Sequence, residues 1–192
     1  GCIIFYMEAI KKIELNKIAK IILVAMLGTL LLTISAKIKI PFYPVPMTMQ
    51  TFIVLFLGIT LGPKIGLLTV SLYLFEGIFG LPVFAGTPEK GIGIVYFTGP
   101  TMGYLIGFLI AVYFAGLLKY EKGPINTFLK LIFSVSFIYI LGLIWLGTLI
   151  GWDKPIFKLG AKPFLLAELF KMLLLLFLIP TLLKAKKLIK II

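Results

Sequence analysis

The sequence lacks two side chains on which many enzymes and nucleic-acid-binding proteins depend. Its 192 residues include no His and no Arg, and they include a single Cys, Cys2. The absence of His excludes acid–base catalysis by imidazole and His-ligated metal sites. A single Cys excludes a disulfide within the chain and Cys-rich metal sites. We therefore expect no catalytic group, no metal site and no cofactor.

The charge is sparse and strongly positive, and Lys alone carries the positive part. Charged residues make up 14% of the chain, against about 25% in soluble domains. Nineteen Lys and seven acidic residues give a formal net charge of +12. Without guanidinium groups the chain has no bidentate fork for phosphates or guanine. It also has no GxxxxGK loop followed by Ser or Thr, so we expect neither nucleic-acid binding nor ATP hydrolysis by this chain.

Long apolar runs between the charges predict an all-α integral membrane protein. About 20 apolar residues cross a hydrocarbon core of roughly 30 Å. We predict six transmembrane helices, over 21–36, 49–61, 65–79, 99–118, 131–151 and 163–183. The second and third are short, and Gly62-Pro63-Lys64 between them predicts a tight turn. We expect three regions: an N-terminal tail (1–20), one six-helix domain (21–183) and a basic C-terminal tail (184–192).

The distribution of Lys predicts the orientation in the membrane. With both termini inside, 12 Lys lie on the cytoplasmic side and 6 on the outer side, and Lys171 lies within a span. Cytoplasmic segments carry the excess of positive charge, so we expect both termini to be cytoplasmic. We interpret residues 1–6, before Met7, as an upstream extension, and we expect the first apolar segment to be retained rather than cleaved.

The outer connections have the composition of a lid over a ligand site. Residues 37–47 contain three Pro, residues 80–98 are rich in glycine and aromatic residues, and residues 151–162 carry Trp152. Long connections in a compact domain are usually functional or disordered, and apolar, aromatic loops are poor candidates for disorder. Eight aromatic residues are candidates for lining an apolar cavity, although a membrane belt or the core would also account for them: Tyr43, Phe84, Tyr96, Phe97, Tyr104, Tyr139, Trp145 and Trp152.

Three ionisable side chains fall inside the predicted spans: Glu76, Glu168 and Lys171. A charge at such a position costs about 2.5–3.5 kcal/mol on insertion scales, which makes each one a functional candidate. Glu168 and Lys171 are three residues apart and share a helix face. They form either a structural ion pair or a clamp for a polar ligand. For Glu76 we favour a pairing with Lys171, or a side chain that reaches the interface.

Small residues at four-residue spacing predict close helix packing. Gly99, Gly103 and Gly107 share one face, and the alternative to packing is the close approach of a ligand at the helix start. Ala25, Thr29 and Thr33 form a second stripe, which is either a docking surface for another membrane protein or a packing surface within the bundle.

Five strings, in this order and at these spacings, resemble the BioY family: PVPMTMQTF (44–52), LGPKIG (61–66), GLPVFAG (80–86), GPTMGYLIGF (99–108) and PFLLAELFK (163–171). The resemblance implies the six-helix fold of the substrate-binding S components of energy-coupling-factor transporters. It further implies high-affinity capture of biotin at the outer side of a prokaryotic plasma membrane. The implied partners are a transmembrane coupling subunit and two ATPase subunits, which would supply the energy.

The resemblance also implies site residues. The family's acid and Lys at the start of the last helix fall on Glu168 and Lys171, with Glu where the family usually has Asp. We hypothesise that Glu168 accepts from a ureido N–H of biotin and that Lys171 donates to its carbonyl or carboxylate. The other expected substrate contacts are Thr48, Gln50, Phe84, Gly86, Thr101 and Tyr104. The coupling motif of the first helix falls on Ala25 and Thr29, with Thr departing from the family's Ala.

One alternative substrate and two other classes of function, an enzyme and a scaffold subunit, compete with this interpretation. The substrate of an S component could be another vitamin, such as thiamine or riboflavin. An intramembrane enzyme would need a His, a metal cluster or a carboxylate dyad with a base, none of which the sequence offers. A scaffold subunit would explain the packing glycines but not the composition of the outer loops.

Overall fold

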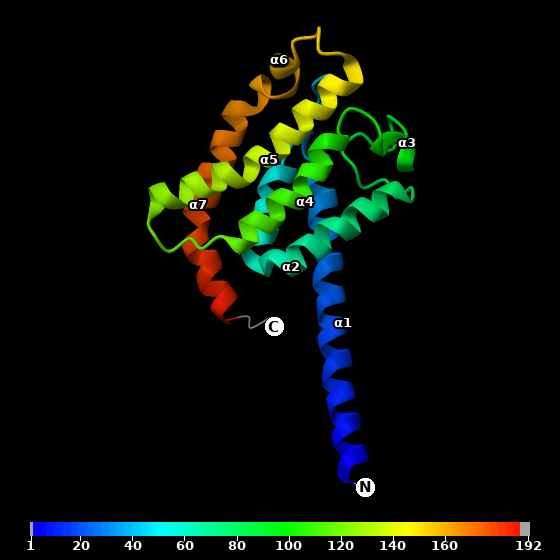
Figure 1. Ribbon diagram of the computed structural model, residues 1–192, viewed down its shortest axis with the longest axis vertical. Coiled ribbons are helices and arrows are strands. Elements are labelled where there is room, and N and C mark those ends of the chain that lie inside the picture. The colour runs from blue at the N-terminus through cyan, green and yellow to red at the C-terminus, as the bar shows by residue number, and fades with distance from the viewer. Residues whose placement is uncertain (1, 189–192) are drawn as a thin grey trace.

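Long helices make up nearly all of the fold (Figure 1). The computed structural model describes residues 2–188, so Gly1 and positions 189–192 of the expected C-terminal tail lie outside the described residues. The helices are α1 (Cys2–Lys37), α2 (Gln50–Ile78), α3 (Gly93–Phe97), α4 (Met102–Leu117), α5 (Pro124–Ile150), α6 (Ile156–Gly160) and α7 (Leu165–Leu188), with a 3-10 turn at Lys162–Phe164. Strands β1 (Lys39–Ile40) and β2 (Met47–Thr48) pair antiparallel and close the proline-rich connection.

Four helical stretches are long and apolar enough to cross a membrane: Met7–Lys37, Gln50–Ile78, Pro124–Ile150 and Ile156–Lys187. Helix α4 is apolar but has 16 residues, which corresponds to a length of about 24 Å. It begins later than predicted, because Gly99–Thr101 form a turn. Helix α5 begins earlier than predicted, because Pro124 starts the helix directly after Gly123, whose φ is 94°. The predicted mainly helical membrane architecture is confirmed at this level.

Helix α1 runs without a break through most of the expected N-terminal tail. Residues 2–20 contain no Gly and no Pro, so nothing in them interrupts the helix before the apolar segment. In Figure 1 the N-terminal half of α1 stands clear of the other helices. Residues 2–20 are therefore an extension of the first membrane helix.

Helix α2 consists of two arms that meet at a kink. Gly62 has φ 82° and ψ 174°, outside the helical region, and Pro63 follows it. Pro63 has no N–H to bond the carbonyl of Ile59 four residues earlier. Lys186 of α7 replaces that donor, with its Nζ 3.2 Å from the Ile59 oxygen. The turn predicted at residues 62–64 is thus a kink between arms 50–61 and 63–78.

Helix α4 lies between α2 and α5 (Figure 1), and glycines bring these helices together. A Cβ on Gly58 of α2 would lie 2.5 Å from the Val112 carbonyl oxygen of α4. On the other face, a Cβ on Gly103 would lie 2.5 Å from the Cβ of Trp145 in α5. The packing interpretation of the α4 glycines is therefore confirmed for Gly103, and Gly107 likewise packs against α5.

Gly99 behaves differently, because it belongs to the turn before α4. Its carbonyl accepts a hydrogen bond from the Trp145 indole at 2.8 Å. A Cβ on Gly99 would contact only the Tyr96 oxygen, at 3.0 Å.

We expect Gly103→Ala to lower the unfolding temperature in detergent by several degrees more than Gly99→Ala. The added methyl at residue 103 must push α4 away from α5, and overpacking of this kind costs about 1–3 kcal/mol. Thermal unfolding of the two purified variants measures the difference. Equal unfolding temperatures would contradict close packing of α4 on α5.

Candidate functional site

A cavity lies between the start of α2, the 80–98 connection and helices α4, α5 and α7. Its empty volume is about 560 Å³, which includes the open space at its mouth. Apolar and aromatic side chains form most of the wall, and a few polar groups converge on it. The lining residues are Val45, Pro46, Met47, Thr48, Gln50, Thr51, Phe84, Ala85, Tyr96, Thr101, Tyr104, Leu105, Phe108, Ile138, Tyr139, Phe164, Glu168 and Lys171.

A buried polar network joins α7 to the start of α2. Glu168 Oε1 accepts hydrogen bonds from Thr51 Oγ1 at 2.6 Å and from Lys171 Nζ at 3.0 Å. Lys171 Nζ also donates to the Thr48 carbonyl at 2.5 Å and lies 3.2 Å from Thr51 Oγ1. Only 6% of Glu168 and 7% of Lys171 is exposed. The pair is therefore desolvated and held by hydrogen bonds, which a buried ion pair requires.

Lys171 and Glu168 differ in how many of their polar atoms lack a hydrogen-bond partner. The three N–H groups of Lys171 already have three acceptors within reach: Thr48, Thr51 and Glu168. By contrast, Glu168 Oε2 is buried and makes no hydrogen bond of good geometry among the described residues, although the Tyr139 hydroxyl lies close to this carboxylate. A buried carboxylate oxygen without a partner is costly. At the wall of this cavity, it is suited to accept a hydrogen bond from an N–H or O–H of a ligand.

Glu76 takes no part in this network. Lys171 pairs with Glu168, and the prediction that Glu76 is its partner is wrong. Glu76 is half-buried on α2, facing Thr29 of α1. The alternative for Glu76, a reach toward the interface, stays a prediction.

Gln50 supports the wall behind the network. Its amide nitrogen donates to Tyr73 Oη at 2.7 Å, and Tyr73 donates to the Val83 carbonyl at 2.8 Å. Helix α2 is thereby joined to the start of the 80–98 connection. Gln50 lines the cavity as predicted, but its amide N–H is engaged by the protein.

Phe84 is the centre of an aromatic cluster at one side of the cavity. The ring is fully buried and its centroid lies 5.5 Å from that of Tyr73, 5.7 Å from Tyr96 and 6.0 Å from Phe97. A Cβ on Gly77 of α2 would overlap the Phe84 ring, so glycine at residue 77 is what admits the ring. The predicted lid segment is thus anchored by an aromatic side chain.

Two lysines from the end of α1 and from β1 hold the same segment by its backbone. Lys37 Nζ donates to the carbonyls of Phe84 at 2.7 Å and Thr87 at 2.5 Å. Lys39 Nζ donates to the carbonyl of Ala85. Because Phe84 and Ala85 line the cavity, this lysine clamp (Lys37 and Lys39) sets the position of one wall.

Comparison with known proteins covers nearly all of the residues that the structure describes. The family model described as "BioY family" matches residues 8–188. The chain belongs to the BioY family. A protein named "Probable biotin transporter BioY" from Pyrococcus horikoshii is 37% identical over 153 residues, 80% of this chain and 90% of that protein. The "Biotin transporter BioY" of Thermotoga maritima is 37% identical over 145 residues, 75% of this chain and 84% of that protein.

A solved structure also resembles the fold. It is the crystal structure of "the S-component for biotin from an ECF-type ABC transporter", with a TM-score of 0.72 and 25% identity. The similarity covers 88% of this chain and 93% of the solved chain. The S-component fold implied by the sequence is confirmed.

Most residues that the BioY resemblance singled out lie together in the structure. Of the eight predicted substrate contacts, seven line the cavity: Thr48, Gln50, Phe84, Thr101, Tyr104, Glu168 and Lys171. Gly86 lies behind the wall, where its N–H donates to Tyr96 Oη at 2.9 Å. Among the eight candidate aromatic residues, Tyr43 and Trp152 are exposed instead. Contact of the seven lining residues with a substrate stays a prediction.

Sequence reasoning missed several residues that line the cavity, among them Thr51 and Phe164. Thr51 hydrogen-bonds Glu168 and Lys171, and its place in the string 44–52, directly after Gln50, was the available signal. Phe164, in the turn before α7, lines the cavity without any chemical signature in the sequence.

The proposed coupling residues are covered within this chain. Ala25 is 2% exposed and Thr29 5% exposed, and the neighbouring Gly28 contacts Thr69 of α2. This arrangement favours the packing alternative for the stripe on α1.

We expect Lys37→Met to speed amide hydrogen exchange in residues 84–88 about tenfold or more. Hydrogen bonds from a charged donor contribute about 1.5–3 kcal/mol, and the substitution removes two of them from the segment. Exchange measured by mass spectrometry on the purified protein tests this. Lys90→Met, on the same connection, is the control, and equal exchange in both variants would rule out the clamp.

Proposed function

We propose that this chain is the biotin-binding subunit of an energy-coupling-factor transporter and that it captures biotin in the cavity beside Glu168. The observation that carries the proposal is the buried Glu168 Oε2, which has no partner among the described residues and belongs to a cavity-lining side chain. The names of the BioY relatives and of the structural neighbour support biotin as the substrate.

Biotin offers chemistry that matches this wall. Its cyclic urea carries two N–H donors and one carbonyl, next to an apolar thioether ring and an anionic tail. The N–H groups suit the acceptor Oε2 of Glu168, and the rings suit the aromatic wall near Phe84 and Tyr104. Lys171 has its N–H groups engaged by the protein, so its main role is to hold the Glu168 carboxylate in position. It reaches a biotin oxygen only by exchanging one of those bonds.

The membrane arrangement is part of the same proposal. We infer six crossings, by α1, the two arms of α2, α4, α5 and α7, with the shorter segments covered by neighbouring helices. Both termini lie in the cytoplasm of a prokaryotic cell, and the cavity opens to the outer side. A transmembrane coupling subunit and two ATPase subunits supply the energy, and the chain needs no cofactor of its own.

We expect Glu168→Gln to weaken biotin binding about 10- to 100-fold, because the amide replaces a charged acceptor in a desolvated site. Isothermal titration of the purified protein in detergent measures the loss. Glu76→Gln is the matched control, because Glu76 is the other carboxylate within the predicted membrane spans and lies outside the cavity. We expect this variant to change the biotin affinity less than twofold.

Unchanged biotin affinity in a folded Glu168→Gln variant would show that Glu168 does not bind biotin. Competition of labelled biotin with thiamine and riboflavin distinguishes the substrates. Displacement by either vitamin at concentrations equal to biotin would favour the alternative substrate.

The orientation has a separate test. In a Cys2→Ser background, we expect Lys158→Cys to react with a membrane-impermeant maleimide in intact cells. Lys187→Cys should react only after permeabilisation, because the proposal places it in the cytoplasm. The reverse pattern would invert the topology, and labelling of both in intact cells would place α6 and the end of α7 on the same, outer side.

A further inference from the structure

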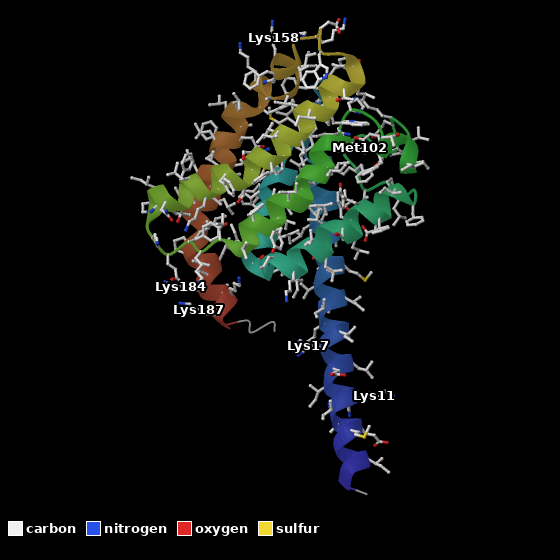
Figure 2. The ribbon with its side chains drawn as sticks, in the orientation of Figure 1. Lys11, Lys17, Met102, Lys158, Lys184 and Lys187 are labelled. Atoms are coloured by element: carbon white, nitrogen blue, oxygen red, sulfur yellow. The ribbon has the colours of Figure 1, made fainter. Side chains whose placement is uncertain are left out.

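A basic groove lies at the end of the bundle opposite the cavity. It is formed by α1, the kink of α2 and the last turns of α7, and we call it the kink groove. Three lysines from three different segments line it: Lys17, Lys64 and Lys186. In Figure 2, Lys17 of α1 and the neighbouring Lys184 and Lys187 of α7 lie at this end, and Lys158 lies at the other.

The kink of α2 fixes the position of one positively charged side chain in the groove. Lys186 donates to the Ile59 carbonyl, whose helical partner is missing at Pro63, so its ammonium is held at the kink with further N–H groups to spare. The second arm of α2 starts at Pro63, and its positive N-terminal end opens on the same groove. One lysine is thus positioned by the fold instead of being free on the surface.

No described residue in the wall of the groove is acidic. Its other lining residues are Ile21, Thr60, Leu61, Gly62, Pro63, Ile65 and Leu68. The acids of α1, Glu8 and Glu14, line a different groove near the N-terminus together with Lys11. None of the three groove lysines has a carboxylate within salt-bridge distance in the described part of the chain. The groove therefore gathers positive charge that the protein leaves uncompensated.

Helix lengths place the groove one membrane thickness from the cavity. From Glu168 to Lys186 along α7 is about 27 Å, and from Lys37 to Lys17 along α1 is about 30 Å. Both match a hydrocarbon core of roughly 30 Å. The three ammonium groups thus lie at the level where lipid phosphates begin, and the exposed Leu68, with Ile21 and Ile65, offers apolar surface beside them.

We propose that the kink groove binds the phosphate of an anionic lipid headgroup, with Lys17, Lys64 and Lys186 as the positive partners. The apolar residues beside the lysines hold part of an acyl chain, which is why we assign the site to a lipid and not to free phosphate. Basic pockets between transmembrane helices recognise such headgroups. This inference does not depend on the substrate of the cavity.

Native mass spectrometry of the full chain in neutral detergent tests the site. The protein is exposed to equal amounts of phosphatidylglycerol and phosphatidylcholine with identical acyl chains. We expect phosphatidylglycerol adducts to exceed phosphatidylcholine adducts about tenfold in the wild type. We expect the combined Lys17→Gln, Lys64→Gln and Lys186→Gln variant to lose this preference. Gln at residue 186 carries an N–H donor on a shorter side chain than Lys, and an unchanged unfolding temperature verifies that the kink is retained.

The matched control is Lys11→Gln, Lys184→Gln and Lys187→Gln, which removes the same charge from the same end of the molecule. It should keep the preference within about twofold. Equal losses in both variants would indicate general surface attraction and overturn the site, as would a preference that survives in the groove variant. Displacement of the lipid by 10 mM inorganic phosphate would show that the lysines bind a free anion and would overturn the lipid site.

If the groove variant lost binding to the coupling subunit but kept the lipid preference, the lysines would instead bind a protein partner.

Discussion

The carboxylate of Glu168 and the ammonium of Lys171 are buried in an otherwise apolar bundle, and each would be costly there without the other. Their mutual hydrogen bond, together with Thr48 and Thr51, fixes α7 against the first residues of α2. The cavity depends on this arrangement. If α7 slid by one turn along α2, both charges would lose their partners, so the network sets the register of the two helices as well as the polar end of the site.

The same requirement for satisfied polar groups governs the rest of the bundle. Where Pro63 removes a backbone donor, Lys186 supplies another, and where the 80–98 connection exposes carbonyls, Lys37 and Lys39 bond them. Long-range lysine contacts thus complete the backbone hydrogen bonding that the irregular segments cannot complete themselves. Glycines serve the complementary task, since Gly103 and Gly107 bring α4 close enough to α5 for their backbones to touch.

The sequence predicted those features that depend on local patterns or on the family resemblance. Apolar runs located the long helices, Gly62-Pro63 located the break in α2, and spacing placed Glu168 and Lys171 on one face. Features that depend on contacts between distant segments could not be read in this way. No periodicity shows that Lys37 reaches Phe84, or that Glu76 faces α1 instead of Lys171, because these outcomes follow from how α1 and α2 are rotated in the bundle.

The two interpretations of Glu168 and Lys171, a structural ion pair and a ligand clamp, are not exclusive in this structure. A carboxylate has two oxygens, and here one oxygen accepts from Thr51 and Lys171 while the other has no partner in the described part of the chain. The first oxygen joins α7 to the start of α2 and, through Thr51 and Lys171, fixes the orientation of the carboxylate. The second oxygen is thereby held in a fixed position on a side chain that lines the cavity. An N–H donor from a ligand would supply the hydrogen bond that the second oxygen lacks. The ion pair that joins the helices therefore also positions the acceptor for a ligand.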